Sequence, residues 1–205
     1  MSDSQTPEFE TDNGFLELIQ PRDEKYIEEL EEDIFDHGCH DAVCVWGNIL
    51  IDGHLRYSIC KKWDIRFNIR RLIFQSRDEA EAYLCAEQLK RTDLTSEYKK
   101  YLIGRLFRAD MNAASAAFLR EHPEKQTNAD GQISQKYVQK TEIATIIGKE
   151  YNFGFSTVTK YDVYARALDE IRAKGPEITN KILNGNLRVS HENVIELSRL
   201  SLIHI

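Results

Sequence analysis

The first part of the chain alternates short apolar runs with amphipathic segments. Apolar runs bounded by turn residues predict strands at four places, which are 15–19, 42–46, 49–51 and 67–74. An apolar residue every three or four positions predicts helices over 23–36, 54–63 and 77–91. Gly47-Asn48, between the second and third runs, is a signal for a tight hairpin. This order indicates a small α/β domain with a mixed sheet.

The rest of the chain shows only helical periodicity. Helices are expected at 98–111, which 113–121 could extend or follow separately, and at 141–151, 157–168, 177–183 and 191–200. The predicted fold class is therefore α+β, a mixed-sheet domain followed by an all-α domain. Five parts are expected: a disordered acidic tail at 1–13, the α/β domain at 14–94, connecting helices at 95–121, a polar linker or mobile loop at 122–136 and a helical domain at 137–200.

Helix ends are marked by capping residues. Gly38 follows the first helical segment and is a typical C-cap, whereas Ser76 with Glu79 forms a capping-box signature. Thr141 and Ser156 are predicted to begin the two helices that follow the linker.

Composition places the chain among ordinary globular proteins. Of its 205 residues, 41% are hydrophobic and 30% are charged, which suffices for a core. No apolar run approaches the ~18 residues of a membrane span, and the acidic start lacks a signal sequence, so we expect a cytoplasmic protein with no membrane partner. The cysteines show no CxxC spacing, which predicts small buried hydrophobes and no metal site; they are Cys39, Cys44, Cys60 and Cys85.

Charge is distributed unevenly along the chain. The net charge is −7, but residues 1–36 carry 13 acidic and two basic side chains, a net of −11, so the remainder carries +4. The acidity therefore belongs to the start of the chain and to one helix face. This asymmetry permits a nucleic-acid partner without requiring one.

A glycine turn joins the third apolar run to the next helix, with the sequence Asp52-Gly53-His54-Leu55-Arg56. Glycine lets the backbone approach a ligand closely, and the start of a helix binds anions such as phosphate through its free amides and its dipole. His54 and Arg56 could close on the same anion. The alternative is an ordinary strand-to-helix connection in which Asp52 caps the helix.

A second segment could also bind an anion. Arg91 stands at the end of a predicted helix, and Glu87 precedes it by one turn. If the sheet brings this end beside Gly53, Arg91 could join His54 and Arg56 on phosphates, because its planar fork matches phosphate oxygens. The alternative is a solvent-facing Arg91 that pairs with Glu87.

The segments 141–151 and 157–168 form a helix–turn–helix pattern. Ala144 and Gly148 suit close packing of the first helix on the second. DNA recognition would fall to the exposed start of the second helix, at Ser156, Thr157, Thr159 and Lys160. Residues 134–174 hold seven bases against five acids, which is weak support. The alternative is a packed helix pair that contacts no DNA.

Four motifs follow one another between Phe15 and Arg105: Leu18-Ile19-x-Pro21, Tyr26-Ile27-x-x-Leu30-x-x-x-Ile34-x-x-x-Gly38, Ile51-Asp52-Gly53-His54-Leu55-Arg56-Tyr57 and Glu87-Gln88-Leu89-Lys90-Arg91-Thr92-Asp93-Leu94-Thr95. With the helix–turn–helix, they resemble the ParB/sulfiredoxin-type fold of chromosome and plasmid partition proteins, more loosely as far as Ser201. The resemblance implies that a Gly-x-x-Arg turn, matched by Gly53 and Arg56, holds the triphosphate of a nucleotide, CTP in the best-known members. It also implies that a Glu-Asn-x-x-Arg box, matched by Glu87 and Arg91, assists.

The chain departs from the partition-protein pattern at three places. His54-Leu55 replaces Glu-Arg in the turn, Gln88 replaces the asparagine of the box, and His40-Asp41 stands where Gln-Pro is usual. The departures keep a pocket for CTP or ATP with Mg²⁺ but reduce the expected hydrolysis to a weak triphosphatase at most. The Gly-His-x-Arg turn is similar to variants on phage and conjugative elements and to the turn of small-molecule kinases that share the fold. Sulfiredoxin chemistry requires a cysteine in the turn and is excluded.

The leading interpretation is a ParB-like DNA-binding protein of a plasmid, phage or other mobile element, with a phosphate or nucleotide pocket in its first domain. The resemblance implies double-stranded DNA as partner, association with a nucleoid or plasmid, and a homodimer. One alternative is an enzyme on the same fold: a phosphotransferase needs an acid such as Asp52 as base, and a nuclease needs clustered carboxylates, for which only Asp52 and Glu87 are candidates. Another is an interaction adaptor with a vestigial pocket.

Overall fold

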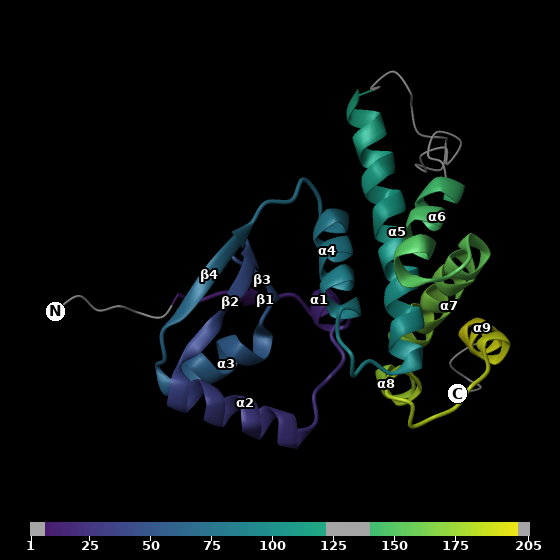
Figure 1. The fold of residues 1–205 in the computed structure, drawn as a ribbon. Coiled ribbons are helices and arrows are strands. Elements are labelled where there is room, and N and C mark those ends of the chain that lie inside the picture. The colour runs from purple at the N-terminus through teal and green to yellow at the C-terminus, as the bar shows by residue number, and fades with distance from the viewer. Residues whose placement is uncertain (1–6, 122–139, 201–205) are drawn as a thin grey trace. The chain divides into compact units, whose positions relative to one another are not determined.

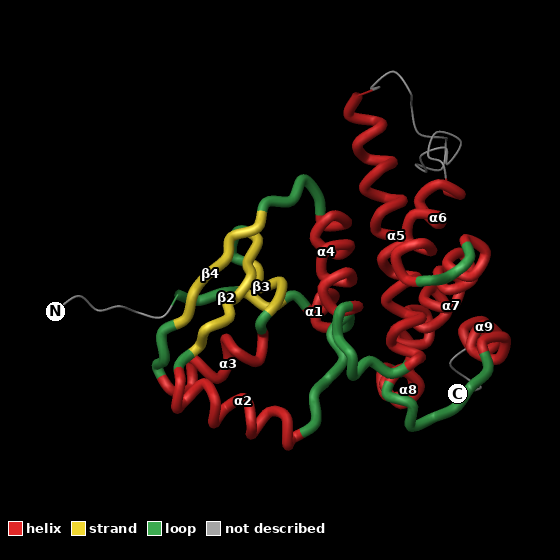
Figure 2. The backbone as a smooth tube through the Cα atoms, in the orientation of Figure 1, coloured by secondary structure: helices red, strands yellow, loops and turns green. Residues whose placement is uncertain are grey.

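The computed structural model describes residues 7–121 and 140–200. The chain forms two compact units, one that ends at Gln75 and one that begins at Ser76, and their relative placement is not determined. The first unit combines a sheet with helices, and the described residues of the second are helical (Figures 1 and 2). Within the described residues, no helix is long and apolar enough to cross a membrane.

The first unit holds β1 (Glu10–Thr11), α1 (Asn13–Leu16), α2 (Glu24–His37), β2 (Cys39–Trp46), β3 (Ile49–Asp52), α3 (His54–Trp63) and β4 (Phe67–Leu72). The second unit holds α4 (Arg77–Leu89), α5 (Ser96–Glu121), α6 (Lys140–Tyr151), α7 (Phe155–Lys174), α8 (Pro176–Leu183) and α9 (His191–Arg199). The predicted class, a small α/β domain followed by a helical part, is confirmed.

The sheet is mixed, with the strand order β1-β3-β2-β4 (Figure 2). The β2–β3 hairpin is antiparallel, and Gly47 in its turn has a φ of +58°, in line with the hairpin signal. Strand β1 pairs parallel with β3, and β4 pairs parallel with β2. Helices α2 and α3 pack on β2 around Ile34, Cys39 and Cys60. All four cysteines are buried and free, as predicted.

The apolar run 15–19 is not a strand, contrary to the prediction. The Asp12 carboxylate accepts two backbone N–H groups of α1 (2.8 and 3.2 Å), and this cap starts a short helix. The first strand is β1, which precedes the cap and pairs with the start of β3. Residues 7–13 thus contribute a strand and a helix cap rather than a tail, and residues 1–6 of the predicted tail lie outside the described residues.

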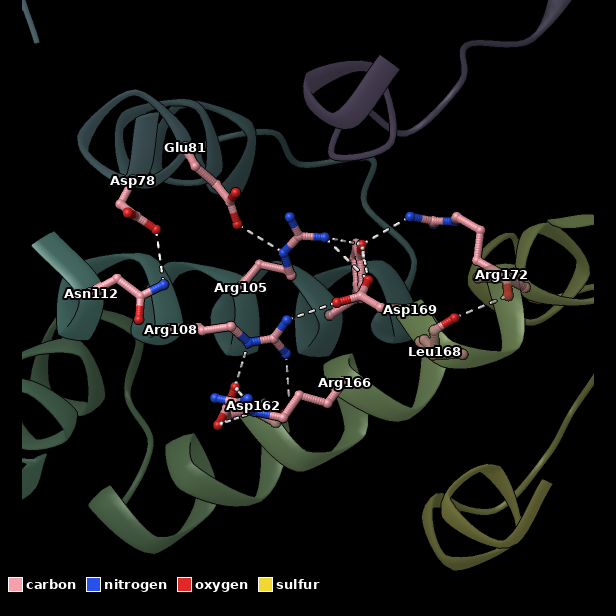
Figure 3. Close-up of polar contacts among 12 residues, drawn as sticks. Asp78, Glu81, Arg105, Arg108, Asn112, Asp162, Arg166, Leu168, Asp169 and Arg172 are labelled. Atoms are coloured by element: carbon pink, nitrogen blue, oxygen red, sulfur yellow. Dashed lines mark hydrogen bonds and ion pairs between the residues drawn. The ribbon is translucent and has the colours of Figure 1, made fainter. Parts of the chain in front are cut away.

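The boundary between the units falls earlier than residue 94. Helix α4 packs along α5, where Arg105 donates to Glu81 (2.8 Å) and Asn112 donates to Asp78 (2.9 Å) (Figure 3). Two helices that bury faces against each other share one core, so α4 belongs to the helical unit although the sequence assigns it to the α/β domain.

The structure decides the lengths of two helices of the second unit. Residues 113–121 extend α5 as one continuous helix, and α7 runs to Lys174 rather than to residue 168. Helix α5 is therefore the centre of the unit and not a connector, because α4, α6 and α7 all pack on or beside it. The predicted linker at 122–136 lies outside the described residues.

Charged side chains join α5 to α7 (Figure 3). Arg108 binds Asp162 (2.9 Å) and Asp169 (2.8 Å), and Arg105 also reaches Asp169 (3.1 Å). The Tyr101 hydroxyl donates to Asp169 as well (2.7 Å). The three-residue step between the arginines and the seven-residue step between the aspartates place each pair on one helix face. The spacing of the arginines and of the aspartates in the sequence thus indicates this network, whereas a count of net charge does not.

Asp110, on α5, has an acidic neighbour on α6. Its partial burial, and then the Glu150 carboxylate, raise the pKa of Asp110 from 3.8 to about 6. A carboxyl whose folded pKa is raised favours the fold at pH values below both pKa values, and this contribution is lost as the pH rises through about 6. We therefore expect Asp110→Asn to raise the free energy of unfolding at pH 7.5 by roughly 1–2 kcal/mol, with solvent screening allowed for, and to change it little at pH 4.

Urea unfolding at the two pH values measures this effect. Glu196→Gln removes an exposed carboxylate of the same unit and serves as the matched control. An equal gain for Asp110→Asn at both pH values would contradict the assignment.

Candidate functional site

Gly53 links β3 to α3 in a conformation that favours glycine. Its φ of +90° and ψ of 26° lie in the left-handed region. A Cβ at this position would lie 3.1 Å from Nη2 of Arg56 and 3.4 Å from Cα of Val43. Gly53 is itself the N-cap residue of α3, so the alternative in which Asp52 takes that position is wrong.

The buried cluster beneath the turn fixes its position. Tyr57, on the first turns of α3, packs with Val43 and Val45 of β2 and Leu50 of β3. The start of α3 is thereby held against both central strands. The backbone of β2 lies next to the turn. The sequence predicted that β2 and β3 form a hairpin, but it did not predict this contact of β2 with the turn.

The side chains of the turn leave three buried polar atoms without a hydrogen-bond partner. These atoms are Nδ1 and Nε2 of His54 and Nε of Arg56. The Nη2 atom of Arg56 donates weakly to the Ala42 carbonyl (3.4 Å) and lies 3.6 Å from the Asp52 carboxylate. An unpaired buried polar group costs roughly 1–3 kcal/mol, so such atoms normally meet a partner. Together with the free amides of the first turn of α3, they are suited to an anion.

The charge state of the turn follows from burial. Desolvation lowers the pKa of His54, and the Asp52 carboxylate raises it by a smaller effect. His54 is therefore neutral at pH 7, while Arg56 and Asp52 offset each other. The turn by itself carries no net side-chain charge.

Glu87 and Arg91 lie in the second unit, at the end of α4 and just after it. Glu87 binds Lys90 (2.6 Å), whereas Arg91 forks onto both carboxylate oxygens of Asp93 (2.7 and 3.1 Å) and contacts the Gln88 side-chain oxygen (3.0 Å). The Arg91 side chain is only 12% exposed, so it is not the solvent-facing residue of the alternative interpretation. Because the two units are not placed relative to each other, convergence of Glu87 and Arg91 on the turn stays a prediction.

Helices α6 and α7 pack against each other and are joined by a tight turn, as the helix–turn–helix pattern predicts. A Cβ on Gly148 would lie 2.4 Å from the carbonyl oxygen of Phe153, so only glycine fits where the chain folds back. The Phe153 N–H donates to the Gly148 carbonyl (2.7 Å), and Ala144 is fully buried. DNA contact by this helix pair stays a prediction.

The residues expected to contact DNA lie in the first two turns of α7: Ser156, Thr157, Thr159 and Lys160. Ser156 is not the N-cap, because Gly154 takes that position and the helix begins at the next residue. Ser156 and Lys160 are exposed, whereas Thr157 and Thr159 are half-buried, and the Thr159 hydroxyl donates to the Ser156 carbonyl (3.0 Å). The freely accessible polar groups are thus on Ser156 and Lys160.

Some of the basic side chains counted in residues 134–174 bind other side chains within the second unit. Arg172 is buried and donates to the Tyr101 hydroxyl (2.9 Å), and Arg166 binds Asp162 (3.0 Å). The exposed lysines of α6 and α7 are Lys140, Lys149 and Lys160. Lys160 is the basic residue of the first two turns of α7.

No family model and no curated protein matches the sequence. Solved structures do match it. The C2221 form of the Pnob8-like ParB-N domain has a TM-score of 0.55 and 20% sequence identity, with 93% of this chain and 75% of that chain covered. The pNOB8-like ParB N-domain has a TM-score of 0.55 and 18% identity, with 93% and 70% covered. The chain has the ParB N-domain fold. This ParB-type likeness spans both units and confirms the fold expected from the four motifs.

Proposed function

We propose that this chain is a ParB-like DNA-binding protein whose Gly53 turn binds the phosphates of a nucleotide. The observation that carries the nucleotide site is the set of unpaired buried atoms on His54 and Arg56, beside a turn in which Gly53 has a left-handed conformation. A phosphate offers several oxygens, enough to accept from Arg56, from the imidazole and from the amides that begin α3. The ParB N-domain fold supports the same assignment.

The proposed ligand is CTP or ATP with Mg²⁺. The backbone at Gly53 would approach the phosphates, Arg56 would provide the fixed cation, and His54 would lie beside it. The phosphate oxygens would accept from Nε of Arg56 and from the imidazole of His54, whose buried nitrogens have no hydrogen-bond partner within the protein. Glu87 and Arg91 are retained as sequence candidates for the same ligand.

The proposed DNA site is the start of α7. Its tight turn with α6 presents Ser156 and Lys160 to solvent, as a helix that enters the major groove requires. We infer that the protein acts on double-stranded DNA as a homodimer, in partition or regulation on a plasmid, phage or other mobile element. The likeness to ParB N-domains supports this setting.

Lys160→Glu is expected to weaken DNA binding by roughly tenfold or more, because it replaces one phosphate contact with a like-charge repulsion. A duplex is first selected from a random-sequence library, and its affinity is then measured by fluorescence anisotropy at several salt concentrations. Lys181→Glu makes the same charge change at an exposed position of α8 and serves as control. Equal losses for the two variants would show that the start of α7 is not the DNA site.

Gel retardation of the selected duplex, with and without CTP or ATP, tests the function as a whole. Retardation that changes with nucleotide supports a ParB-like protein. Nucleotide turnover without retardation would instead indicate an enzyme on this fold, and neither activity would indicate an adaptor.

A further inference from the structure

His54 is half-buried at the turn, and its two ring nitrogens are buried without a hydrogen-bond partner, although a neutral imidazole has one donor and one acceptor to satisfy. We propose that His54 takes up a proton from solvent when a terminal phosphate binds, and that this proton makes the turn selective for terminal phosphates over phosphodiesters. The inference rests on the phosphate site proposed above and assigns its ligand class and its response to pH.

The charge balance of the turn gives the first reason. Arg56 lies 3.6 Å from Asp52, so the one permanent cation of the turn is already offset. His54 is neutral because burial lowers its pKa. A phosphate dianion would therefore meet no net positive side-chain charge. An imidazolium supplies that charge, and it also turns both orphaned ring nitrogens into donors.

The surroundings of His54 give the second reason. Among the described residues, Asp52 at the end of β3 is the charged group that shifts the pKa of His54 upward, and Arg56 is the other charge on the turn. Helix α2 and strand β2, which pack against α3, add no charge that shifts this pKa. The negative charge of a bound ligand can therefore change the protonation state of His54.

The selectivity follows from the charge of the ligand. A terminal phosphate carries close to two negative charges near neutral pH, whereas each phosphodiester of a DNA backbone carries one. The second charge stabilises a buried imidazolium that a phosphodiester would leave poorly compensated. A protein that binds both molecules could in this way keep its nucleotide turn free of DNA.

Isothermal titration of the full chain with linear inorganic triphosphate tests the inference. Titrations between pH 6 and 8, in buffers of different ionisation enthalpy, report the protons taken up on binding. Near pH 7, we expect the wild type to take up close to one proton on binding, in addition to any proton that the triphosphate itself gains or loses. We also expect its affinity to rise by up to about tenfold for each unit decrease in pH. Trimetaphosphate, a cyclic analogue with no terminal phosphate, is expected to bind at least tenfold more weakly and without this proton.

His54→Gln should remove the extra proton and flatten the pH dependence, whereas His37→Gln, an exposed histidine of the same unit, should leave both unchanged. His54→Phe is the second variant if the glutamine variant does not fold. Equal proton uptake in wild type and folded His54 variants overturns the inference and leaves the phosphate site standing. Equal affinity for trimetaphosphate overturns the selectivity. Failure of the folded wild type to bind triphosphate, CTP and ATP overturns the proposed site itself.

Discussion

Arg56→Ala is expected to weaken CTP and ATP binding by roughly 100-fold or more, below detection in a calorimetric titration, while the first unit stays folded. A hydrogen bond to a charged group contributes about 1.5–3 kcal/mol, and a guanidinium that forks onto phosphate makes more than one. The contacts of Arg56 within the protein are long, 3.4 Å to the Ala42 carbonyl and 3.6 Å to Asp52, so its removal takes little from the fold.

Two further variants sharpen this test. Arg56→Lys keeps the charge but loses the planar fork, and it should bind with intermediate affinity. Arg66→Ala removes an exposed arginine of the same unit and should bind as the wild type does. Circular dichroism and thermal unfolding report whether each variant is folded. Undiminished CTP and ATP binding by folded Arg56→Ala would remove the turn as the nucleotide site.

Gly104→Ala is expected to destabilise the helical unit by about 3 kcal/mol or more, because it overfills the crossing of α5 and α7. A Cβ on Gly104 would lie 2.1 Å from the carbonyl oxygen of Tyr161 and 2.6 Å from its carbonyl carbon. Both are backbone atoms of α7, so no side-chain rotation can relieve the overlap. The better helix propensity of alanine, about 1 kcal/mol, does not offset this cost.

The same crossing carries the partly buried ion pairs of Arg108 with Asp162 and Asp169 (Figure 3). Separation of the helices would stretch these pairs and leave charges unpaired, which adds to the loss. Urea unfolding measures the effect. Gly175→Ala is the matched control, because its new methyl would meet only Ile178 Cδ1 at 3.9 Å. Similar stabilities for the two variants would show that α5 and α7 do not depend on this close approach.

Local signals in the sequence predicted most of the elements. The Gly38 C-cap, the Ser76 cap and the Gly47-Asn48 hairpin all occupy their expected places, because each depends on a few neighbouring residues. The prediction of a strand at 15–19 was wrong for an equally local reason, because the Asp12 cap starts a helix where the apolar pattern alone indicates a strand. The prediction of Ser156 as a cap was wrong because Gly154 is the N-cap of α7.

The site divides in the same way. Asp52, Gly53, His54 and Arg56 are neighbours in the sequence, so their gathering on one turn could be predicted, and the left-handed φ of Gly53 agrees with it. The lack of hydrogen-bond partners for the ring nitrogens of His54 and for Nε of Arg56 could not be predicted, since it depends on how β2 and the core close around them. Nor could the partners of Arg91, which folds back onto Asp93 rather than toward solvent.

The sequence by itself determined the order of elements, the glycine turn and the helix pair of α6 and α7, because periodicity, caps and turn residues act over a few positions. The tertiary structure decided the rest. It assigned α4 to the helical unit through the face that it buries on α5, and it turned apparent surface charges on α5 and α7 into an internal network. It also converted an ambiguous turn into a candidate phosphate site, because burial and unpaired hydrogen-bonding groups exist only once distant strands have packed together.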